Sequence, residues 1–294
     1  ASAQARRDKI PAGFNTSATA NPTPTYTYSP ESGVRARAYY AEAKVPVFGA
    51  QESGWKRDLE LQLSVRRDES TVRARTDGNS IIVPSLDGPF PAVTYNERDF
   101  AATKMTAGFK YAPTKDVAVR ASWGTGFLAP GINQLQPSAA FPVSLNFIDP
   151  KRGNVAALVP LTLTAGGNAN LQAENSKSMS AGLVFTPRWL PRFRLSLDLT
   201  RIEKTGEIAS LLPQDTVNAE AALPGRVTRA ALTPADQALG YTGGAITAMD
   251  VSSVNVAQKR ITAYDIQADY TVAPQSWGSL QLYAIGTYQP EYAF

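Results

Sequence analysis

The chain has 294 residues, 43% hydrophobic and 18% charged, which is enough apolar material for one large β domain or two smaller ones. It contains no cysteine and no histidine, which excludes disulfides, thiol chemistry, most zinc sites and Ser-His-Asp catalysis. We therefore expect a protein that is not an enzyme, with no catalytic residues, no metal site and no cofactor. The formal net charge is +4, but lysine and arginine are scattered along the chain, so we expect no nucleic-acid partner.

No segment contains the roughly 20 consecutive apolar residues of a membrane-spanning helix, so the chain can cross a bilayer only with a closed set of strands. Residues 1–33 have little apolar periodicity and include a stretch rich in Thr, Pro and Ser, which predicts a loop or arm. The start of the chain, Ala1 to Ala3, resembles the small residues of a cleavage site with no apolar segment before it. This pattern indicates either a leader that has been removed or a fragment.

From residue 34 onward, segments of roughly 8 to 12 residues alternate between apolar and polar side chains, which is typical of β-strands with two different faces. Residues 59–66 show the alternation without interruption, with Leu or Val at every odd position and Glu, Gln, Ser or Arg between them. About eight strands are predicted in this way, at 34–45, 59–66, 104–111, 117–123, 177–185, 192–202, 261–272 and 278–288. The sequence therefore predicts an all-β protein.

The connections between these strands alternate between short and very long. Short connections are expected around 46–58, 112–115, 186–191 and 273–277, and long ones at 67–103, 124–176 and 203–259. Three of the four tryptophans, Trp55, Trp189 and Trp277, fall in short connections, which resembles an aromatic girdle. Barrels of the bacterial outer membrane have short periplasmic turns and long extracellular loops. The pattern therefore favours antiparallel transmembrane β-barrel strands, with residues 1–33 on the extracellular side and the barrel segment at 34–294.

One short helix is expected inside the last long connection. Thr233 stands where an N-cap is common, Pro234 where the first helical residue would lie, and Gly240 where a helix would end. A soluble β protein with one face on a core and one face in water is the alternative to the membrane barrel.

Two stretches of sequence carry a family resemblance. The segment VRASWGTGFLAPGINQL, residues 119–135, resembles a barrel motif of TonB-dependent outer-membrane receptors, and GGNANLQAENSKSMSAGLVFTP, residues 166–187, is similar to the next motif of that family. A third segment, residues 224–240, followed by Asn255, also resembles barrel loops of the family. The residues that match the motifs are Trp123, Gly124, Phe127, Pro130, Asn133, Gly167, Asn168, Leu171 and Glu174.

The resemblance implies part of a large plugged barrel of roughly 22 strands. It implies the bacterial outer membrane, active uptake of a siderophore, cobalamin or oligosaccharide, and contact with lipid and lipopolysaccharide. Further implied partners are the plug domain and the remaining barrel strands, neither of which is visible in this sequence, and the TonB energy complex, which acts through the plug. Side chains that could face the lumen and touch ligand or plug are Arg120, Arg194, Asp198, Asp265 and Asp269. A passive porin-like or structural barrel and a soluble β-rich binding module remain as alternatives.

Overall fold

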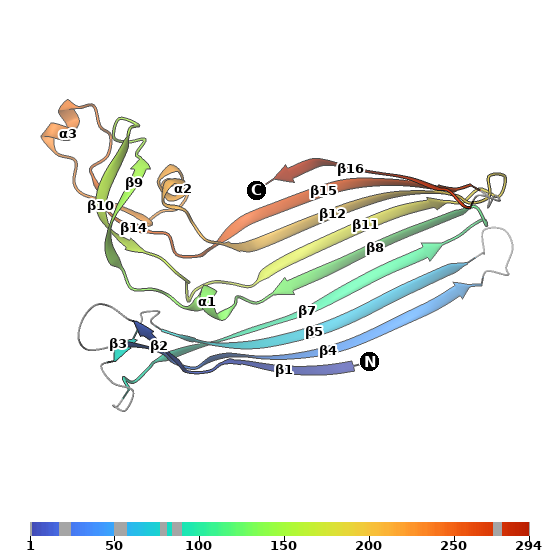
Figure 1. Cartoon of the computed structure of the whole chain (residues 1–294), viewed down its shortest axis with the longest axis horizontal. Coiled ribbons are helices and arrows are strands. Elements are labelled where there is room, and N and C mark those ends of the chain that lie inside the picture. Colours follow the sequence, from blue (N-terminus) through green and yellow to red (C-terminus); the bar gives the residue numbers. More distant parts are fainter. Residues whose placement is uncertain are drawn as a thin grey trace.

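Nine antiparallel strands form one open sheet in the computed structural model, which describes residues 2–17, 25–49, 58–76, 81–83, 90–272 and 278–293 (Figure 1). Its strands, in spatial order, are β1 (Ser2–Ile10), β4 (Ser32–Phe48), β5 (Leu59–Arg75), β7 (Tyr95–Tyr111), β8 (Val117–Leu128), β11 (Glu174–Phe185), β12 (Phe193–Ala209), β15 (Val254–Thr271) and β16 (Gln281–Ala293). Strands β1 and β16 are its two edges, so the described strands form a curved wall that does not close on itself. The predicted all-β antiparallel class is confirmed.

One face of this wall is apolar from β4 to β16. The strand register aligns Leu61, Phe109, Ala121, Ala181, Leu199, Tyr264 and Tyr288 in a single row across seven strands. Large side chains on this face are exposed, with 56% of Leu63 and 57% of Met179 accessible. An exposed apolar belt of this extent is what a lipid-facing surface requires. We call this side the outer face.

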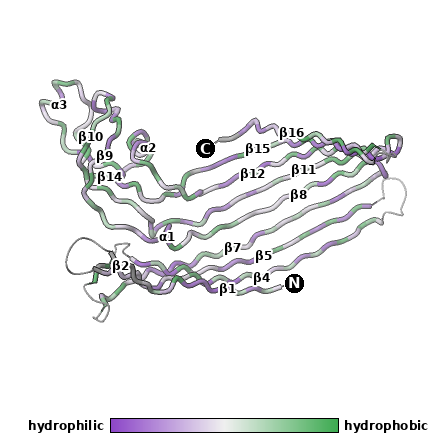
Figure 2. The backbone as a smooth tube through the Cα atoms, in the orientation of Figure 1, coloured by the Kyte–Doolittle hydropathy of each residue, from purple (hydrophilic) through white to green (hydrophobic). Residues whose placement is uncertain are grey.

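The opposite side of the wall, which we call the inner face, is polar. The neighbouring row of the register contains Glu60, Lys110, Arg120, Gly182, Asp198, Asp265 and Thr287. Figure 2 shows the hydrophilic and hydrophobic residues alternating along the strands. Because successive side chains of a strand point to opposite faces, this alternation gives the wall one apolar and one polar side.

The two ends of the wall differ in the length of their connections (Figure 1). One end has short turns at 112–116 and 186–192. The other end has the long connections, which contain α1 (Ile132–Leu135), β9 (Phe141–Ile148), β10 (Ala156–Thr164), α2 (Pro213–Asn218), β13 (Val227–Arg229), α3 (Pro234–Ala238) and β14 (Ile246–Asp250). A separate three-stranded sheet is built from β2 (Gly13–Ser17), β3 (Thr25–Ser29) and β6 (Ile81–Val83). The predicted alternation of short and long connections is therefore confirmed for the described turns.

Two long connections combine into one structural unit, which we call the loop module (residues 141–165 and 211–251). Its four-stranded sheet has the order β13-β14-β10-β9, and the parallel pairing of β10 with β14 joins the two connections. The buried core of the module consists of Phe147, Leu161, Leu163, Val217, Ile246, Met249 and Val251. A module with its own core holds the two connections together.

Three expectations need correction. Residues 1–33 are not only a loop or arm, because β1 pairs with β4 over Ser2–Ile10 and β2 and β3 follow it. Strand β1 has no large apolar residue before Ile10, so it lacks the periodicity that identified the other strands. The main sheet accordingly has nine strands where about eight were expected, and β1 lies within the wall and not above it.

The strands are also longer than predicted, and β4, β5, β7 and β12 each have 17 residues. Beyond the apolar belt their outer-facing residues become polar, for example at Arg67 and Glu69, although the hydrogen-bonded ladder continues. Apolar alternation therefore ends before the strand does, and the long connections are shorter than expected, at about 76–94, 129–173 and 210–253.

The predicted short helix is confirmed. Thr233 is the N-cap of α3, its hydroxyl accepts a hydrogen bond from the Asp236 backbone, and Pro234 is the first helical residue. Gly240 follows with a φ of +73°, a conformation that favours glycine. Trp189 lies exposed in the short turn at 186–192, whereas Trp55 and Trp277 lie outside the described residues.

Candidate functional site

Strand β8 leaves its neighbour β7 halfway along the wall. The β7–β8 ladder ends at the pair Thr106 and Gly124, whereas β8 remains paired with β11 as far as Leu128 and Glu174. The Nζ atom of Lys104 on β7 reaches across this divergence to Asn175 Oδ1 at 2.8 Å and lies 5.8 Å from the ring centre of Phe127. The segment after β8 is thus directed away from β7 and toward the inner face.

This segment packs into the mouth of the wall on its inner face. Helix α1 contacts β4 and β5, and Leu135 is only 2% exposed. Its buried neighbours Val72, Ala74 and Phe100 point to the same face as Lys104, since they lie at even positions of β5 and β7. Leu171 (1% exposed) and Phe127 belong to the same cluster. The family-motif residues Phe127, Pro130 and Leu171 therefore fix a folded segment inside the wall.

Two motif residues hold the returning chain against α1. Gly167 lies so close to the α1 segment that a Cβ atom would be 2.5 Å from the carbonyl oxygens of Asn133 and Gln134. The backbone of Asn168 donates to the Gln134 carbonyl at 2.7 Å, and its side chain donates to the Ser253 carbonyl at 3.1 Å. Only glycine fits at position 167. Asn168 links the connection at 129–173 to the one at 210–253.

Glu174 is a buried carboxylate at the start of β11. Its Oε2 atom lies 3.0 Å from Lys204 Nζ on β12, and its Oε1 atom accepts a hydrogen bond of 2.9 Å from the Ile208 backbone. Asn255 on β15 makes similar contacts. Its side chain accepts a hydrogen bond from the Gln172 backbone amide and donates to the carbonyl oxygens of Gln172 and, at 2.7 Å, Gly206. These contacts fasten the motif segment to the next two strands, which is a structural role.

Two other motif residues, Trp123 and Gly124, lie apart from this cluster in the wall itself, whereas Asn133 is part of α1. Trp123 is on the outer face, 41% exposed, where it pairs with Ala107 and Met179. Gly124 is buried between neighbouring strands, and Asn133 is exposed on α1. Sequence matching alone groups these residues, but the fold divides them between the wall and its mouth.

All five predicted lumen-facing residues lie on the inner face. Arg120 forms an ion pair of 2.9 Å with Asp198, and the pair spans Gly182, where any side chain would collide with it. Asp265 accepts a hydrogen bond from Thr287, and Asp269 accepts one from Gln267. Arg194 stands opposite Asp269 in the register. Arg120 and Asp198 therefore satisfy each other, and none of the five has a contact that identifies a ligand.

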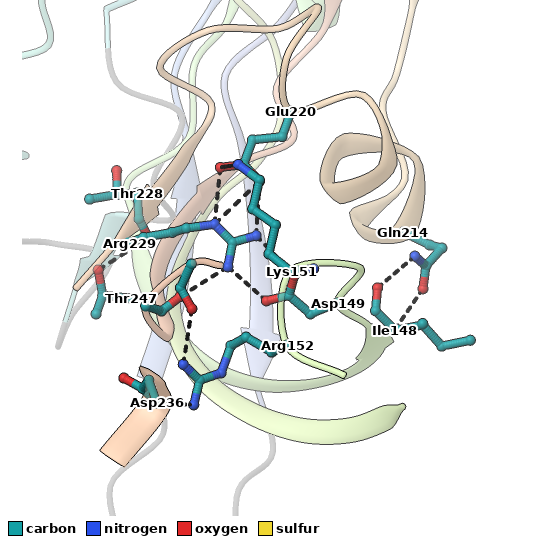
Figure 3. A network of polar contacts seen from close by, with 12 residues as sticks. Ile148, Asp149, Lys151, Arg152, Gln214, Glu220, Thr228, Arg229, Asp236 and Thr247 are labelled. Atoms are coloured by element: carbon teal, nitrogen blue, oxygen red, sulfur yellow. Dashed lines mark hydrogen bonds and ion pairs between the residues drawn. The ribbon is translucent and has the colours of Figure 1, made fainter. Parts of the chain in front are cut away.

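Sequence reasoning missed the polar centre of the loop module (Figure 3). Arg229 is only 11% exposed, and its guanidinium binds Asp149 at 2.7 Å and Glu220 at 2.8 Å. Lys151 also pairs with Glu220, at 3.0 Å. The hydrogen bond from Arg229 lowers the pKa of Glu220 below its usual range, and the two carboxylates raise the pKa of Arg229 despite its burial. Asp149 comes from one long connection and Arg229 from the other, so this network links the two.

Arg98 was also missed, although it lies at the mouth of the wall. Its guanidinium donates hydrogen bonds to the carbonyl oxygens of Ala169 and Leu171. An isolated arginine in a strand gives no sequence signal for such a contact. For the loop module a signal existed, because residues 141–147 and 159–163 alternate apolar and polar side chains.

No helix among the described residues is long and apolar enough to cross a membrane. In the same part of the chain, no group of acidic side chains is arranged to hold a metal ion.

A family model described as "TonB dependent receptor-like, beta-barrel" matches residues 3–293. Among solved structures, the Serratia marcescens hemophore receptor HasR in complex with HasA and heme is 14% identical, with a TM-score of 0.46, 91% of this chain covered and 38% of that chain. The siderophore receptor PirA from Acinetobacter baumannii is 10% identical, with a TM-score of 0.46 and coverage of 98% and 41%. The RagAB peptide transporter is 13% identical, with a TM-score of 0.42 and coverage of 98% and 34%.

A search of the curated proteins found no match to this sequence. The chain spans 34% to 41% of the three solved structures named above. The family match extends over nearly the whole chain and agrees with the open antiparallel wall and its apolar outer face. The chain belongs to the TonB-dependent receptor-like β-barrel family, a family of receptors and not of enzymes, and lies in the bacterial outer membrane.

Proposed function

We propose that this chain is the barrel portion of a receptor that binds an extracellular ligand and carries it across the outer membrane with energy supplied through TonB. The observation that carries the proposal is the loop module, which joins two long connections at one end of a lipid-facing wall. Long connections of such barrels lie on the extracellular side. A rigid module there gives the receptor a preformed surface for a ligand arriving from outside.

The mouth of the wall supplies a second part of the proposed ligand path. A cavity of about 640 Å³ lies between the inner face of β1, β4, β5 and β7 and the segment 125–131. Arg6, Arg66 and Lys104 line it, together with Asp68. The proposed ligand classes are a siderophore, cobalamin or an oligosaccharide, and we expect Arg120, Arg194, Asp198, Asp265 and Asp269 to face either that ligand or the plug.

The open edges of the wall support further partners. Hydrocarbon cannot satisfy the unpaired backbone groups of β1 and β16, so in the membrane both edges need additional strands. We propose that these strands complete a larger barrel, that a plug fills its lumen, and that TonB acts on the plug. Lipid and lipopolysaccharide would cover the outer face.

The test is uptake by cells that express the complete gene in a strain without competing receptors. Radiolabelled ferric siderophores, cobalamin and oligosaccharides are supplied, each with and without a functional TonB complex. We expect one ligand class to accumulate only when TonB is functional. A variant lacking residues 211–251, the second of the two segments of the loop module, should insert into the membrane yet lose ligand binding at the cell surface.

The alternative functions predict different results. A passive porin-like channel would give uptake that is independent of TonB and unsaturated at high ligand concentration. Accumulation of no ligand class, or equal accumulation with and without TonB, would contradict the proposal.

A further inference from the structure

Strand β9 forms one edge of the four-stranded sheet in the loop module, and among the described strands only β10 pairs with it. Its eight residues, Phe141–Ile148, pair with β10 without a bulge, and none of them is charged. The strand at the other edge, β13, is only three residues long, contains Arg229 and has a register shift in its pairing. Short length, charge and bulges are the usual protection of an exposed strand edge. β13 has all three, and β9 has none of them.

The backbone groups of every second residue of β9 point to this open edge. The side-chain nitrogen of Gln214 on α2 donates to the Ile148 carbonyl at 2.9 Å, and its side-chain oxygen accepts from the Ile148 amide at 2.8 Å (Figure 3). The Ile148 backbone therefore points away from β10, and the backbone of Asn146 and Ser144 points the same way, because the ladder alternates every two residues. Pro160 of β10 stands opposite Ser144 and has no amide hydrogen to donate, which agrees with this assignment.

The open part of the edge is short and well defined. No strand, loop or side chain among the described residues pairs with the backbone of Ser144 or Asn146 on this edge, and both residues are exposed. Pro142 limits the stretch at one end because it has no amide hydrogen, and Gln214 already occupies the Ile148 backbone at the other end. Two amide donors and their carbonyl oxygens are thus left for a short strand.

The side chains around the open edge are uncharged. Residues 141–148 and 155–164 contain no acidic or basic side chain. Val143 and Leu145 pack against the module core and are only half-buried, and Leu158 on the opposite face is 69% exposed. Small apolar side chains at alternate positions of an added strand would cover this surface, whereas charged ones would lie beside it without partners.

We propose that the β9 edge binds an extended, uncharged segment of a partner protein at the cell surface, which adds to the loop module as a fifth strand. Hydrogen bonds to the backbone of Ser144 and Asn146 supply the affinity, and contacts with Val143 and Leu145 supply the side-chain preference. The carboxamide of Gln214 already takes the place that a peptide group of such a strand would have. The edge selects a polypeptide, because sugars and metal chelates lack amide donors and carbonyl acceptors repeated at the spacing of a strand.

Strand addition and ligand uptake can fail separately. The proposal places the module on the extracellular side, as the proposed function does, but its test uses purified receptor without ligand and without the TonB complex. Uptake without strand addition would overturn the fifth strand and leave the transport function standing. Strand addition without uptake would have the reverse meaning.

The test is saturation-transfer NMR, which detects weak binding of a peptide in excess over the complete receptor in mild detergent. The probe is the peptide Ser-Thr-Val-Thr-Val-Thr-Ser with blocked ends, at millimolar concentration. We expect this peptide to bind and to slow amide hydrogen exchange in residues 141–148 of the wild type. The same peptide methylated on its central backbone nitrogens should not bind, and this comparison needs no variant of the receptor.

Ser144→Pro combined with Asn146→Pro removes both edge donors and leaves the ladder to β10 intact, since proline is tolerated on an edge strand. This double variant should bind the peptide roughly 25-fold more weakly, about fivefold for each hydrogen bond lost. Ser144→Ala combined with Asn146→Ala is the matched control, because it keeps both amide hydrogens, and it should change binding by less than about twofold.

Four results would overturn the proposal. These are no binding of the unmethylated peptide, equal binding of both peptides, equal binding by the wild type and the proline variant, and slow exchange of the β9 edge before any peptide is added. The last result would mean that another part of the receptor covers the edge. A receptor dimer that the proline variant dissociates would make a second copy the occupant and would likewise contradict a separate partner protein.

Discussion

Replacing Arg229 by methionine should loosen the loop module without unfolding the nine-stranded wall. The guanidinium of Arg229 lies between two carboxylates, and both ion-pair partners are largely buried, with side-chain exposures of 9% for Asp149 and 18% for Glu220. Methionine keeps much of the side-chain volume but leaves Asp149 with no cationic partner. Lys151 still neutralises Glu220 in the variant.

The expected magnitude follows from this uneven loss. Removing one partner of a buried ion pair costs about 3 to 5 kcal/mol, because a charge remains buried without compensation. Since only one of the two carboxylates becomes unpaired, we expect the lower limit, about 3 kcal/mol for local opening of the module. This corresponds to roughly a 100-fold rise in the opening equilibrium.

Hydrogen exchange followed by mass spectrometry measures this opening in the detergent-solubilised receptor. Peptides from residues 141–165 and 211–251 should lose about two orders of magnitude of protection, while peptides from β11 and β12 should remain unchanged. Lys115→Met serves as a control, because Lys115 is an exposed residue of a short turn at the opposite end. Unchanged protection in the module, or an equal loss in the wall, would refute the assigned role of Arg229.

Three further substitutions test the contacts at the mouth of the wall and in α3. Gly167→Ala should displace the returning chain from α1, because its Cβ would meet two carbonyl oxygens, and a smaller fraction of the receptor should survive as the folded band on unheated gels. Glu174→Gln should lower the free energy of unfolding by about 1.5 to 3 kcal/mol in urea titrations, whereas the exposed Glu69→Gln should stay within about 1 kcal/mol. Hydrogen bonds from Arg152 and Thr233 lower the pKa of Asp236 to about 2, below its usual value of 3.8. The carboxylate therefore stabilises α3 fully above about pH 4, and this contribution is lost as the pH falls toward 2. Asp236→Asn should therefore show at pH 7 the reduced amide protection of α3, relative to the intrinsic exchange rate, that the wild type shows only in acid.

The wall could be predicted from the sequence because the bilayer imposes a simple pattern on it. Every second residue of segments such as 59–66 must be apolar, and this pattern can be recognised without knowing which strands pair. The helix α3 was predictable for a local reason, since Thr233, Pro234 and Gly240 specify its ends within eight residues. Both kinds of signal depend on neighbours in the sequence.

The parts that could not be predicted depend on residues distant in sequence. Strand β1 is held by the edge of β4 and contains charged residues on both faces, so its composition resembles that of a loop. Arg229 and Asp149 are 80 residues apart, and only the fold shows that they meet. The motif residue Trp123 was placed correctly in a strand. Only the structure shows that β8 diverges from β7 after Gly124, so that Trp123 and Phe127 lie in different parts of the molecule.

Labelling of single cysteines tests the central claim, that the wall has one face in lipid and one in a hydrated lumen. These 294 residues contain no cysteine, so each variant carries a single thiol within this part of the receptor. Leu63→Cys and Gln62→Cys are neighbours on β5 that point to opposite faces. In receptor embedded in outer membranes, the first should react only with a membrane-soluble maleimide and the second also with a charged, water-soluble one. Equal reaction of both variants with the charged reagent would contradict a lipid-facing wall.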